Sequence, residues 1–387
     1  MSFRFSLFIK VLFIAFLFSL GMVFRFWGLG AISGDMRYYL IPWYNEIAAQ
    51  GFKSFSTSFS NYTPPYLYFL ALATLTKSFI PQVVAIKLIS IFFDVINVVL
   101  ITKIARVKYL DGLVPIFAAA SFWVLPTIFI NSAFWGQADA IYTCFLLLTF
   151  YFHLKGRPLA TMIVYGISVS FKAQAIFLAP FLFLFVLKKR IPWYCFGVIP
   201  IVYMVLMVPA LLAGRPIMNL LTIYFSQATN YQSLAMRSPN PYIFFPNTSY
   251  SSVVLPGFFL AVILTGLWVY RYGIRRIEHE PDNLAFFALI SVIMMPFFLP
   301  KMHDRYFYPA DVFSLVLAIF TRSMWFIPLL YQLISGLAYL GFLFDLPNTV
   351  IKIAAIINTM TFGYLLWRQY RLSQAGKREE DFIQKME

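Results

Sequence analysis

The sequence predicts an all-α, polytopic membrane protein, and three observations of composition and pattern support this. Of its 387 residues, 61% are hydrophobic and only 12% are charged, whereas soluble domains are typically about 45–50% apolar and about 25% charged. Lys and Arg outnumber Asp and Glu by 30 to 15, which is typical of proteins that set their membrane topology with basic residues. Apolar segments of helix length follow one another along the whole chain. This composition excludes a water-soluble enzyme.

A window of about 19 residues predicts about twelve transmembrane helices with short connectors. The first, 7–27, follows Arg4 as a signal peptide would, but no small-residue cleavage pattern follows it, so we interpret it as a retained helix. The others are expected at 82–105, 112–131, 137–154, 159–172, 175–187, 193–213, 252–272, 283–299, 306–321, 324–342 and 349–367.

Charge decides how the apolar segment 64–80 is placed. If it does not cross the membrane, 19 of the 30 Lys and Arg residues fall on the same side as Arg4 and Lys10, as the positive-inside rule requires. We therefore expect 64–80 to form an outer juxtamembrane helix, and both termini to be cytoplasmic. A single transmembrane domain, 1–387, would then have two long outer loops, 28–81 and 214–251, and a cytoplasmic tail, 368–387. Loops of this length commonly bear function.

The first polar candidate is Asp35, which lies a few residues beyond the first helix and beside aromatic residues. A carboxylate at this membrane boundary can accept a proton from a sugar hydroxyl, while Trp and Tyr rings stack on the sugar. The alternative is that Asp35 only caps a helix expected at 37–50.

The second candidate is the segment Trp135-Gly136-Gln137-Ala138-Asp139, at the outer end of an inward-running helix. We expect Gln137 to cap that helix. Asp139 either faces the bundle as a functional group or complements the positive end of the helix dipole. A deeper carboxylate, Asp94, is expected to pair with Lys87 two turns earlier in the same helix.

Two basic segments complete the set of candidates. Lys172 ends an unusually short predicted helix, and it either extends to the lipid headgroups or holds a phosphate in an outward cavity. The segment Lys301-Met302-His303-Asp304-Arg305 is the densest polar cluster outside the cytoplasmic ends. It is either a charged interhelical turn or a phosphate clamp in which arginine supplies paired donors, and its density favours the clamp.

These residue types suit a transferase whose leaving group is a lipid phosphate. The acceptor hydroxyl needs a base and the departing phosphate needs cations, but a phosphate leaves without a general acid. The chain has no phosphate-binding glycine-rich loop and no zinc motif, and its two cysteines lie in apolar runs. We therefore expect no cofactor and no metal. The alternatives are a transporter or lipid-carrier flippase, which would be expected to show internal repeats, and a membrane acyltransferase with His303 as base.

In order along the chain, these motifs resemble those of the GT-C superfamily of polytopic glycosyltransferases. The matching elements are an Asp in the first outer loop, Asn-Tyr-x-Pro-Pro-Tyr at 61–66, Trp-Gly-Gln-x-Asp at 135–139, Phe-Lys-x-Gln at 171–174 and Lys-Met-His-Asp-Arg-Tyr at 301–306. Within the superfamily, the chain is most similar to the branch related to the GPI second mannosyltransferase and its bacterial homologues. The resemblance extends over about residues 20–312.

The resemblance implies a polyprenyl-phosphate sugar donor, with mannose as the first expectation, a lipid or glycan acceptor, and inversion at the anomeric carbon. It also implies a bacterial plasma membrane, with the reaction on its outer, periplasmic side. Asp35 would be the general base. The donor phosphate would be held by Lys172, Lys301, His303 and Arg305. The sugar or acceptor would be bound by Arg37, Tyr62, Tyr66, Trp135, Gln137, Asp139, Gln174 and Asp304.

Overall fold

The computed structural model describes residues 2–229, 231–275 and 279–384. Two of the basic residues counted on the cytoplasmic side, Arg276 and Lys385, lie outside the described residues. The chain divides into two compact units, one formed by Met1–Ile176 and Lys189–Gln232 and the other by Phe177–Lys188 and Ser233–Glu387. The single domain expected from the sequence stays a prediction. Helices make up nearly all of the described chain.

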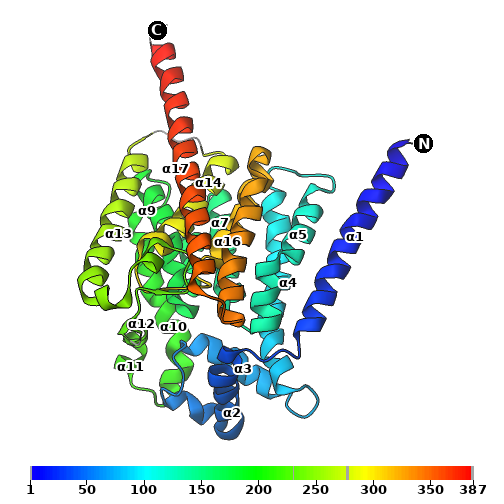
Figure 1. The fold of residues 1–387 in the computed structure, drawn as a ribbon, viewed down its shortest axis with the longest axis vertical. Helices are drawn as coiled ribbons and strands as arrows, with labels where there is room; N and C mark the ends of the chain where they lie inside the picture. The colour runs from blue at the N-terminus through cyan, green and yellow to red at the C-terminus, as the bar shows by residue number, and fades with distance from the viewer. Residues whose placement is uncertain (1, 230, 276–278, 385–387) are drawn as a thin grey trace. The chain divides into compact units, whose positions relative to one another are not determined.

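Within the described residues of the first unit, every regular element is a helix (Figure 1). Its η1 and η3 segments are π-helical, while η2 and η5 are 3-10 helices. Its elements are α1 (Ser2–Gly28), η1 (Met36–Leu40), α2 (Ile41–Gln50), η2 (Gly51–Ser56), α3 (Pro64–Thr74), α4 (Gln82–Ala105), α5 (Val114–Val124), α6 (Pro126–Phe129), η3 (Ile130–Trp135), α7 (Asp139–Leu154), α8 (Pro158–Phe171), η5 (Trp193–Gly197), α10 (Val198–Leu212), α11 (Ile217–Leu221) and α12 (Ile223–Thr229).

The segment 28–81, predicted to be an outer loop, folds into short helices, and α3 occupies the start of the ambiguous segment 64–80. Pro64 and Pro65 form the first turn of α3, where the missing proline N–H groups cost no helical hydrogen bond. The 11 residues of α3 span about 16 Å at about 1.5 Å per residue, too short for a hydrocarbon core of about 30 Å. α2 and α3 lie against each other next to the start of α4 (Figure 1). This length agrees with the expected juxtamembrane helix.

The helix predicted at 112–131 is present but broken, because the chain bends there. α5 ends at Val124, and the helical segment Pro126–Trp135 follows at an angle of 53°. Pro126 accounts for the break, since proline has no N–H for the helical ladder and disfavours a helical residue before it. The second segment continues as a π-helix to Trp135, so the bend directs this end of the chain toward the site described below.

Buried charges join α1, α4 and the bent segment, but not in the expected pairing. Asp94 is fully buried and accepts hydrogen bonds from Arg25 Nη2 at 2.8 Å and from Ser132 Oγ at 2.6 Å. The Arg25 guanidinium also lies 3.4 Å from the ring centroid of Trp123. Lys87 instead donates to the carbonyl of Gly28, the last residue of α1, and to that of Ala31 just beyond it. The predicted Lys87–Asp94 pair is therefore wrong, because a cation from another helix reaches the carboxylate.

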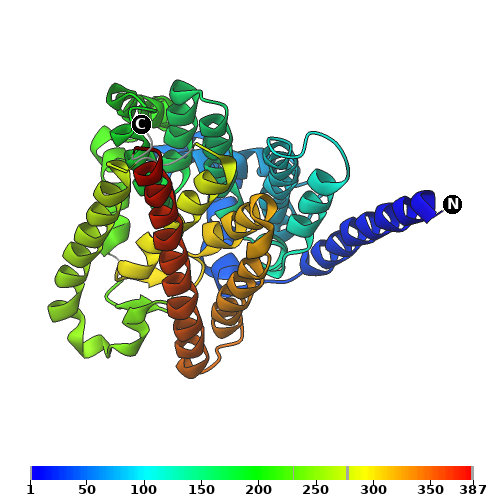
Figure 2. The same cartoon turned by 90° about the horizontal axis from the view of Figure 1, so that it is seen from above.

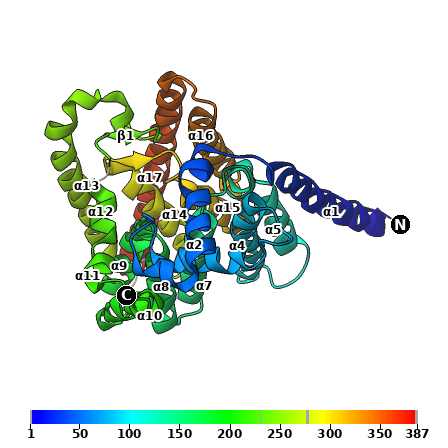
Figure 3. The same cartoon turned by 90° about the horizontal axis from the view of Figure 1, so that it is seen from below.

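The second unit is built around α14 and α15, whose side chains are almost all buried. α16 and α17 run side by side (Figure 2), and α17 stays helical well into the tail predicted at 368–387. The short strands β1 and β2 pair in parallel (Figure 3). The elements are α9 (Ala179–Leu187), β1 (Ala235–Met236), η6 (Pro241–Phe244), η7 (Asn247–Ser249), α13 (Tyr250–Gly273), α14 (Pro281–Phe298), β2 (Met302–His303), α15 (Tyr308–Phe320), η8 (Arg322–Met324), α16 (Phe326–Leu343) and α17 (Asn348–Gln384).

Each of the twelve predicted spans coincides with helical structure, although not all of these helices are long. Seven described helices are long and apolar enough to cross a bilayer, and the bent pair makes eight if it counts as one span. Four further apolar helices have 10–17 residues: Asp139–Leu154, Pro158–Phe171, Ala173–Leu187 and Tyr308–Phe320. The third of these contains η4 (Ala173–Leu178). The number of crossings stays a prediction.

Candidate active site

Asp35 lies immediately before η1, and its side chain makes no helix-capping hydrogen bond. Its Oδ2 instead accepts hydrogen bonds from Trp135 Nε1 at 3.0 Å and from Gln137 Nε2 at 2.6 Å. The Asp35 side chain is half-buried, whereas Trp135 is fully buried and Gln137 nearly so. The structure thus joins the first two sequence candidates in one network, and fixes the direction of the Asp35 carboxylate by two donors from a distant segment.

Local backbone geometry explains how Trp135 and Gln137 both reach Asp35. The π-helix η3 ends at Trp135, and Gly136 adopts a left-handed conformation with φ of 79°, which favours glycine over every other residue. Asn131 O then accepts a hydrogen bond from Gln137 N at 2.9 Å. The predicted capping role of Gln137 is wrong, since α7 begins at Asp139 without a side-chain cap. π-helical turns often occur at functional sites, and here η1 and η3 both adjoin the network.

Tyr62 extends the network away from Asp35. Its hydroxyl donates to Gln137 Oε1 at 3.3 Å. Its ring lies 5.1 Å from that of Trp43 and 5.0 Å from that of Tyr66. Tyr66 is almost completely buried, so it supports Tyr62 from within the unit.

Lys172 and Asp139 form a buried ion pair near Tyr62. Asn131 Nδ2 also donates to Asp139 Oδ2 at 2.9 Å, and Lys172 Nζ lies 5.7 Å from the ring centroid of Tyr62. Lys172 is 8% exposed, so the alternative in which it extends to the headgroups does not describe its conformation. As the first residue of α7, Asp139 complements the helix dipole and also binds this lysine.

Two further predicted residues of the first unit stand outside this network. Arg37 is exposed, and in the described part of the chain its side chain makes no hydrogen bond or ion pair. Gln174 lies in η4 and is half-buried, and its Oε1 has no hydrogen-bond partner among the described residues. Their predicted contacts with sugar or acceptor stay predictions.

The basic segment 301–305 belongs to the second unit, where its backbone pairs with the second outer loop. Lys301 N donates to Leu234 O at 2.8 Å, and Asp304 N donates to Met236 O at 3.0 Å. Lys301 has a positive φ of 66°. This pairing between residues far apart in sequence gives the segment a defined backbone.

The side chains of this segment contact one another and nearby rings. Arg305 Nη1 lies 3.4 Å from Oδ1 of the buried Asp304. The His303 ring lies 5.1 Å from that of Tyr306, and Lys301 Nζ lies 5.4 Å from the ring centroid of Tyr250. The segment therefore concentrates three basic side chains on one ordered turn.

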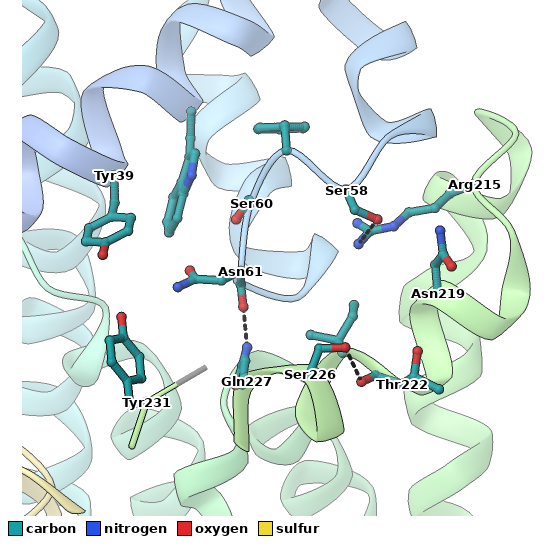
Figure 4. Close-up of a pocket in the computed structure, with 13 residues that line it drawn as sticks. Tyr39, Ser58, Ser60, Asn61, Arg215, Asn219, Thr222, Ser226, Gln227 and Tyr231 are labelled. Atoms are coloured by element: carbon teal, nitrogen blue, oxygen red, sulfur yellow. Dashed lines mark hydrogen bonds between the residues drawn. The ribbon is translucent and has the colours of Figure 1, made fainter. Parts of the chain in front are cut away.

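A cavity of about 580 Å³ in the first unit has polar residues that the sequence did not single out (Figure 4). The predicted first outer loop contributes Tyr39, Trp43 and residues 58–61, and the predicted second outer loop contributes Arg215, Asn219, Thr222, Ile223, Ser226, Gln227 and Tyr231. Arg215, at its wall, is 4% exposed. The only signal in the sequence was its position at the start of a long outer loop, because no motif surrounds it.

Comparisons with known proteins concern the fold. No protein-family model matches the sequence, and a search of curated proteins finds no match. The structure is similar to the crystal structure of ArnT from Cupriavidus metallidurans bound to undecaprenyl phosphate, with a TM-score of 0.53 and 13% sequence identity. The alignment covers 94% of this chain and 78% of that one.

This similarity confirms the predicted fold class. The chain has a nearly all-helical, polytopic membrane fold with several apolar spans, like that of ArnT. The narrower resemblance, to the branch related to the GPI second mannosyltransferase, stays a prediction.

Proposed function

We propose that this protein is a glycosyltransferase that moves a monosaccharide from a polyprenyl-phosphate donor to a hydroxyl of a lipid or glycan acceptor. The observation that supports this best is the Asp35 carboxylate, held by Trp135 and Gln137 through a single oxygen. A general base has to point at one proton in one direction, and donors from a rigid, buried segment provide that direction.

The fold similarity supports the donor class. ArnT, a GT-C glycosyltransferase, was crystallised with undecaprenyl phosphate, which is a polyprenyl phosphate. At 13% identity the likeness concerns the fold, so we transfer the lipid class to this chain as part of the proposal. The concentration of basic groups at 301–305 suits a lipid phosphate as well.

The reaction is a single displacement. The acceptor oxygen forms a bond to the anomeric carbon while the bond from that carbon to the phosphate oxygen breaks. The hydroxyl proton passes to Asp35, and the polyprenyl phosphate departs as an anion with the bonding electron pair. Since one nucleophile replaces one leaving group at the opposite face, the anomeric configuration inverts.

The other network residues act through Asp35. Trp135 and Gln137 orient the base, and Tyr62 orients Gln137. Lys172 balances the charge of Asp139, so its ammonium is less suited to a donor phosphate than expected from the sequence. We assign the phosphate to Lys301, His303 and Arg305, with Arg305 supplying paired donors. Mannose is the first candidate sugar, and the outer, periplasmic face of a bacterial plasma membrane is the proposed side of reaction.

The test is transfer by the purified full chain in lipid vesicles. Radiolabelled polyprenyl-phosphate mannose, glucose and arabinose are each incubated with the protein and with extracted membrane lipids and glycans as acceptors. We expect label from one donor to enter an acceptor, with release of polyprenyl phosphate. If no donor is consumed while labelled lipid equilibrates across the vesicle bilayer, the protein is a lipid-carrier flippase and the proposal is wrong.

A further inference from the structure

The proposed function assigns no ligand to the cavity of about 580 Å³ in the first unit (Figure 4). Its volume is within the range of about 300–1,000 Å³ found for small-molecule sites. Both long outer loops contribute to it, and all of its lining residues belong to the first unit. It therefore unites two segments that the sequence marked as functional by length alone.

Arg215 is the charged residue of this cavity. Its Nη2 donates to Ser58 Oγ at 3.1 Å, whereas its Nε has no hydrogen-bond partner in the described chain. Burial lowers the pKa of the Arg215 guanidinium, while the phenols of Tyr203 and Tyr68 nearby raise it. Among the residues that the structure describes, no carboxylate forms an ion pair with it.

The positive charge and the N–H donors of this buried guanidinium are only partly satisfied by the protein. Charged groups removed from water are normally paired and hydrogen-bonded, and arginine has five N–H donors. An oxyanion in the cavity would supply both the opposite charge and the acceptors. Since arginine binds planar or tetrahedral oxyanions with paired hydrogen bonds, a carboxylate or phosphate group fits this position.

The rest of the lining suits a saccharide. The rings of Tyr39, Trp43 and Tyr231 provide faces on which a sugar ring can stack. Side-chain amides of Asn219 and Gln227, together with several hydroxyl groups, provide donors and acceptors for sugar hydroxyls. Figure 4 shows the amides and hydroxyls around the space between the two loops.

One ring contact and two sequence neighbours link the cavity to the proposed base. Trp43, which lines the cavity, lies 5.1 Å from the ring of Tyr62 in the Asp35 network. Asn61, which also lines it, directly precedes Tyr62, and Tyr39 is four residues beyond Asp35. A ligand in the cavity is thus held by residues adjoining the catalytic network.

We propose that this cavity binds the acceptor, and that the acceptor is a saccharide with an oxyanion, phosphate or carboxylate, held by Arg215. The assignment as acceptor rests on the proposed function, whereas binding of the anionic sugar does not. The cavity would then select the acceptor, and Asp35 would take the proton of its hydroxyl.

Equilibrium dialysis of the full chain in lipid nanodiscs tests the binding. The probes are radiolabelled glucose 6-phosphate, glucuronate, glucose and inorganic phosphate. We expect one of the two anionic sugars to bind about tenfold more tightly than glucose, as a charge-assisted hydrogen-bond pair implies. Arg215→Gln should remove that difference. The matched control Lys53→Gln removes an exposed positive charge from the first outer loop without altering the cavity, and should leave binding unchanged.

Several results would overturn the inference. Equal binding of glucose and both anionic sugars would exclude selection by charge, and equal binding of inorganic phosphate would indicate a simple anion site. If Arg215→Gln does not fold, Asn219→Phe decides, because this exposed side chain can fill the cavity without disturbing the core. Unchanged affinity for the anionic sugar in Asn219→Phe would show that the sugar binds elsewhere.

Asp35→Asn separates this inference from the proposed function. It should lower transfer about a hundredfold to ten-thousandfold while anionic-sugar binding persists. If transfer persists instead, the base assignment is wrong while the binding result for Arg215 stands independently.

Discussion

Two carboxylates of the first unit, Asp35 and Asp94, are held in contrasting ways. Asp94 is completely buried, and its bonds come from the Arg25 guanidinium and the Ser132 hydroxyl. Asp35 is half-buried, and neutral N–H groups of Trp135 and Gln137 bind one of its oxygens. Arg25, the partner of Asp94, is itself buried.

The difference shows which carboxylate can act on a substrate. A fully buried carboxylate bonded to a guanidinium cannot be reached by an acceptor. A half-buried carboxylate oriented by neutral donors keeps a defined direction and access to its surroundings. The contrast therefore supports the proposed catalytic role of Asp35 and a role of Asp94 in helix association, and each of the following changes tests it.

The largest effect is expected for Asp35→Asn. The amide keeps the shape but cannot take a proton, so transfer should fall about a hundredfold to ten-thousandfold, while the thermal unfolding midpoint changes little. The measurement is initial transfer rate with a radiolabelled donor. Glu46→Gln is the matched control, since Glu46 lies in α2 of the same outer loop and accepts a hydrogen bond from Gln50; it should transfer normally. Near-normal transfer by Asp35→Asn would contradict the comparison.

Asp94→Asn should act on stability instead. It leaves the buried Arg25 charge uncompensated, which costs about 3–5 kcal/mol of unfolding free energy. Thermal unfolding in detergent should show a lower midpoint, and the protein that remains folded should keep its transfer rate. The double variant Arg25→Met/Asp94→Leu removes both charges and should recover most of the stability. A folded, stable Asp94→Asn with little transfer would place Asp94 in catalysis.

Lys172→Met tests the Lys172–Asp139 ion pair. This pair is buried, as Asp94 is, but it lies near Tyr62 of the Asp35 network. If Lys172 serves Asp139, its removal should cost about 3 kcal/mol of stability, and Lys172→Met/Asp139→Leu should restore the thermal unfolding midpoint. The affinity for polyprenyl phosphate would then stay the same in the double variant. A donor KM raised strongly in both variants would instead support the phosphate-binding role predicted from the sequence.

Gly136→Ala tests the turn that orients the donors of Asp35. An alanine at φ of 79° costs about 1–2 kcal/mol, and its Cβ would collide with Met36 Cε. Displacement of Trp135 or Gln137 should lower transfer about tenfold to a hundredfold. In Gly34→Ala the added Cβ meets open space, so this control should keep the normal rate. Equal rates in both variants would show that the turn does not position the base.

Tyr62→Phe should have the smallest effect. It removes only the hydrogen bond to Gln137, at 3.3 Å, and leaves the ring contacts in place. A loss of about 0.5–1.5 kcal/mol corresponds to a transfer rate a few times lower. Tyr38→Phe, at an exposed tyrosine, is the control. A loss as large as that of Asp35→Asn would mean that Tyr62 contacts the substrate itself.

The sequence predicted much of the secondary structure and part of the site. α4 has the predicted bounds, and α8 ends one residue before Lys172 as a short helix, because hydrophobic runs and their polar ends are local features. The sequence indicated Asp35 and Gln137 as separate candidates, but it did not predict the hydrogen bond between them. Arg215 was overlooked, since a lone arginine in a loop has no pattern that reveals its burial.

The sequence by itself determined the membrane class, the all-α fold and the positions of the helices, because the transfer of apolar segments from water to lipid depends on local composition. Only the tertiary structure decided which polar groups meet. Arg25 binds a carboxylate 69 residues away, and Trp135 binds one 100 residues away. Such pairing depends on how the helices pack and on how the bend at Pro126 and the turn at Gly136 direct the chain, which no local pattern specifies.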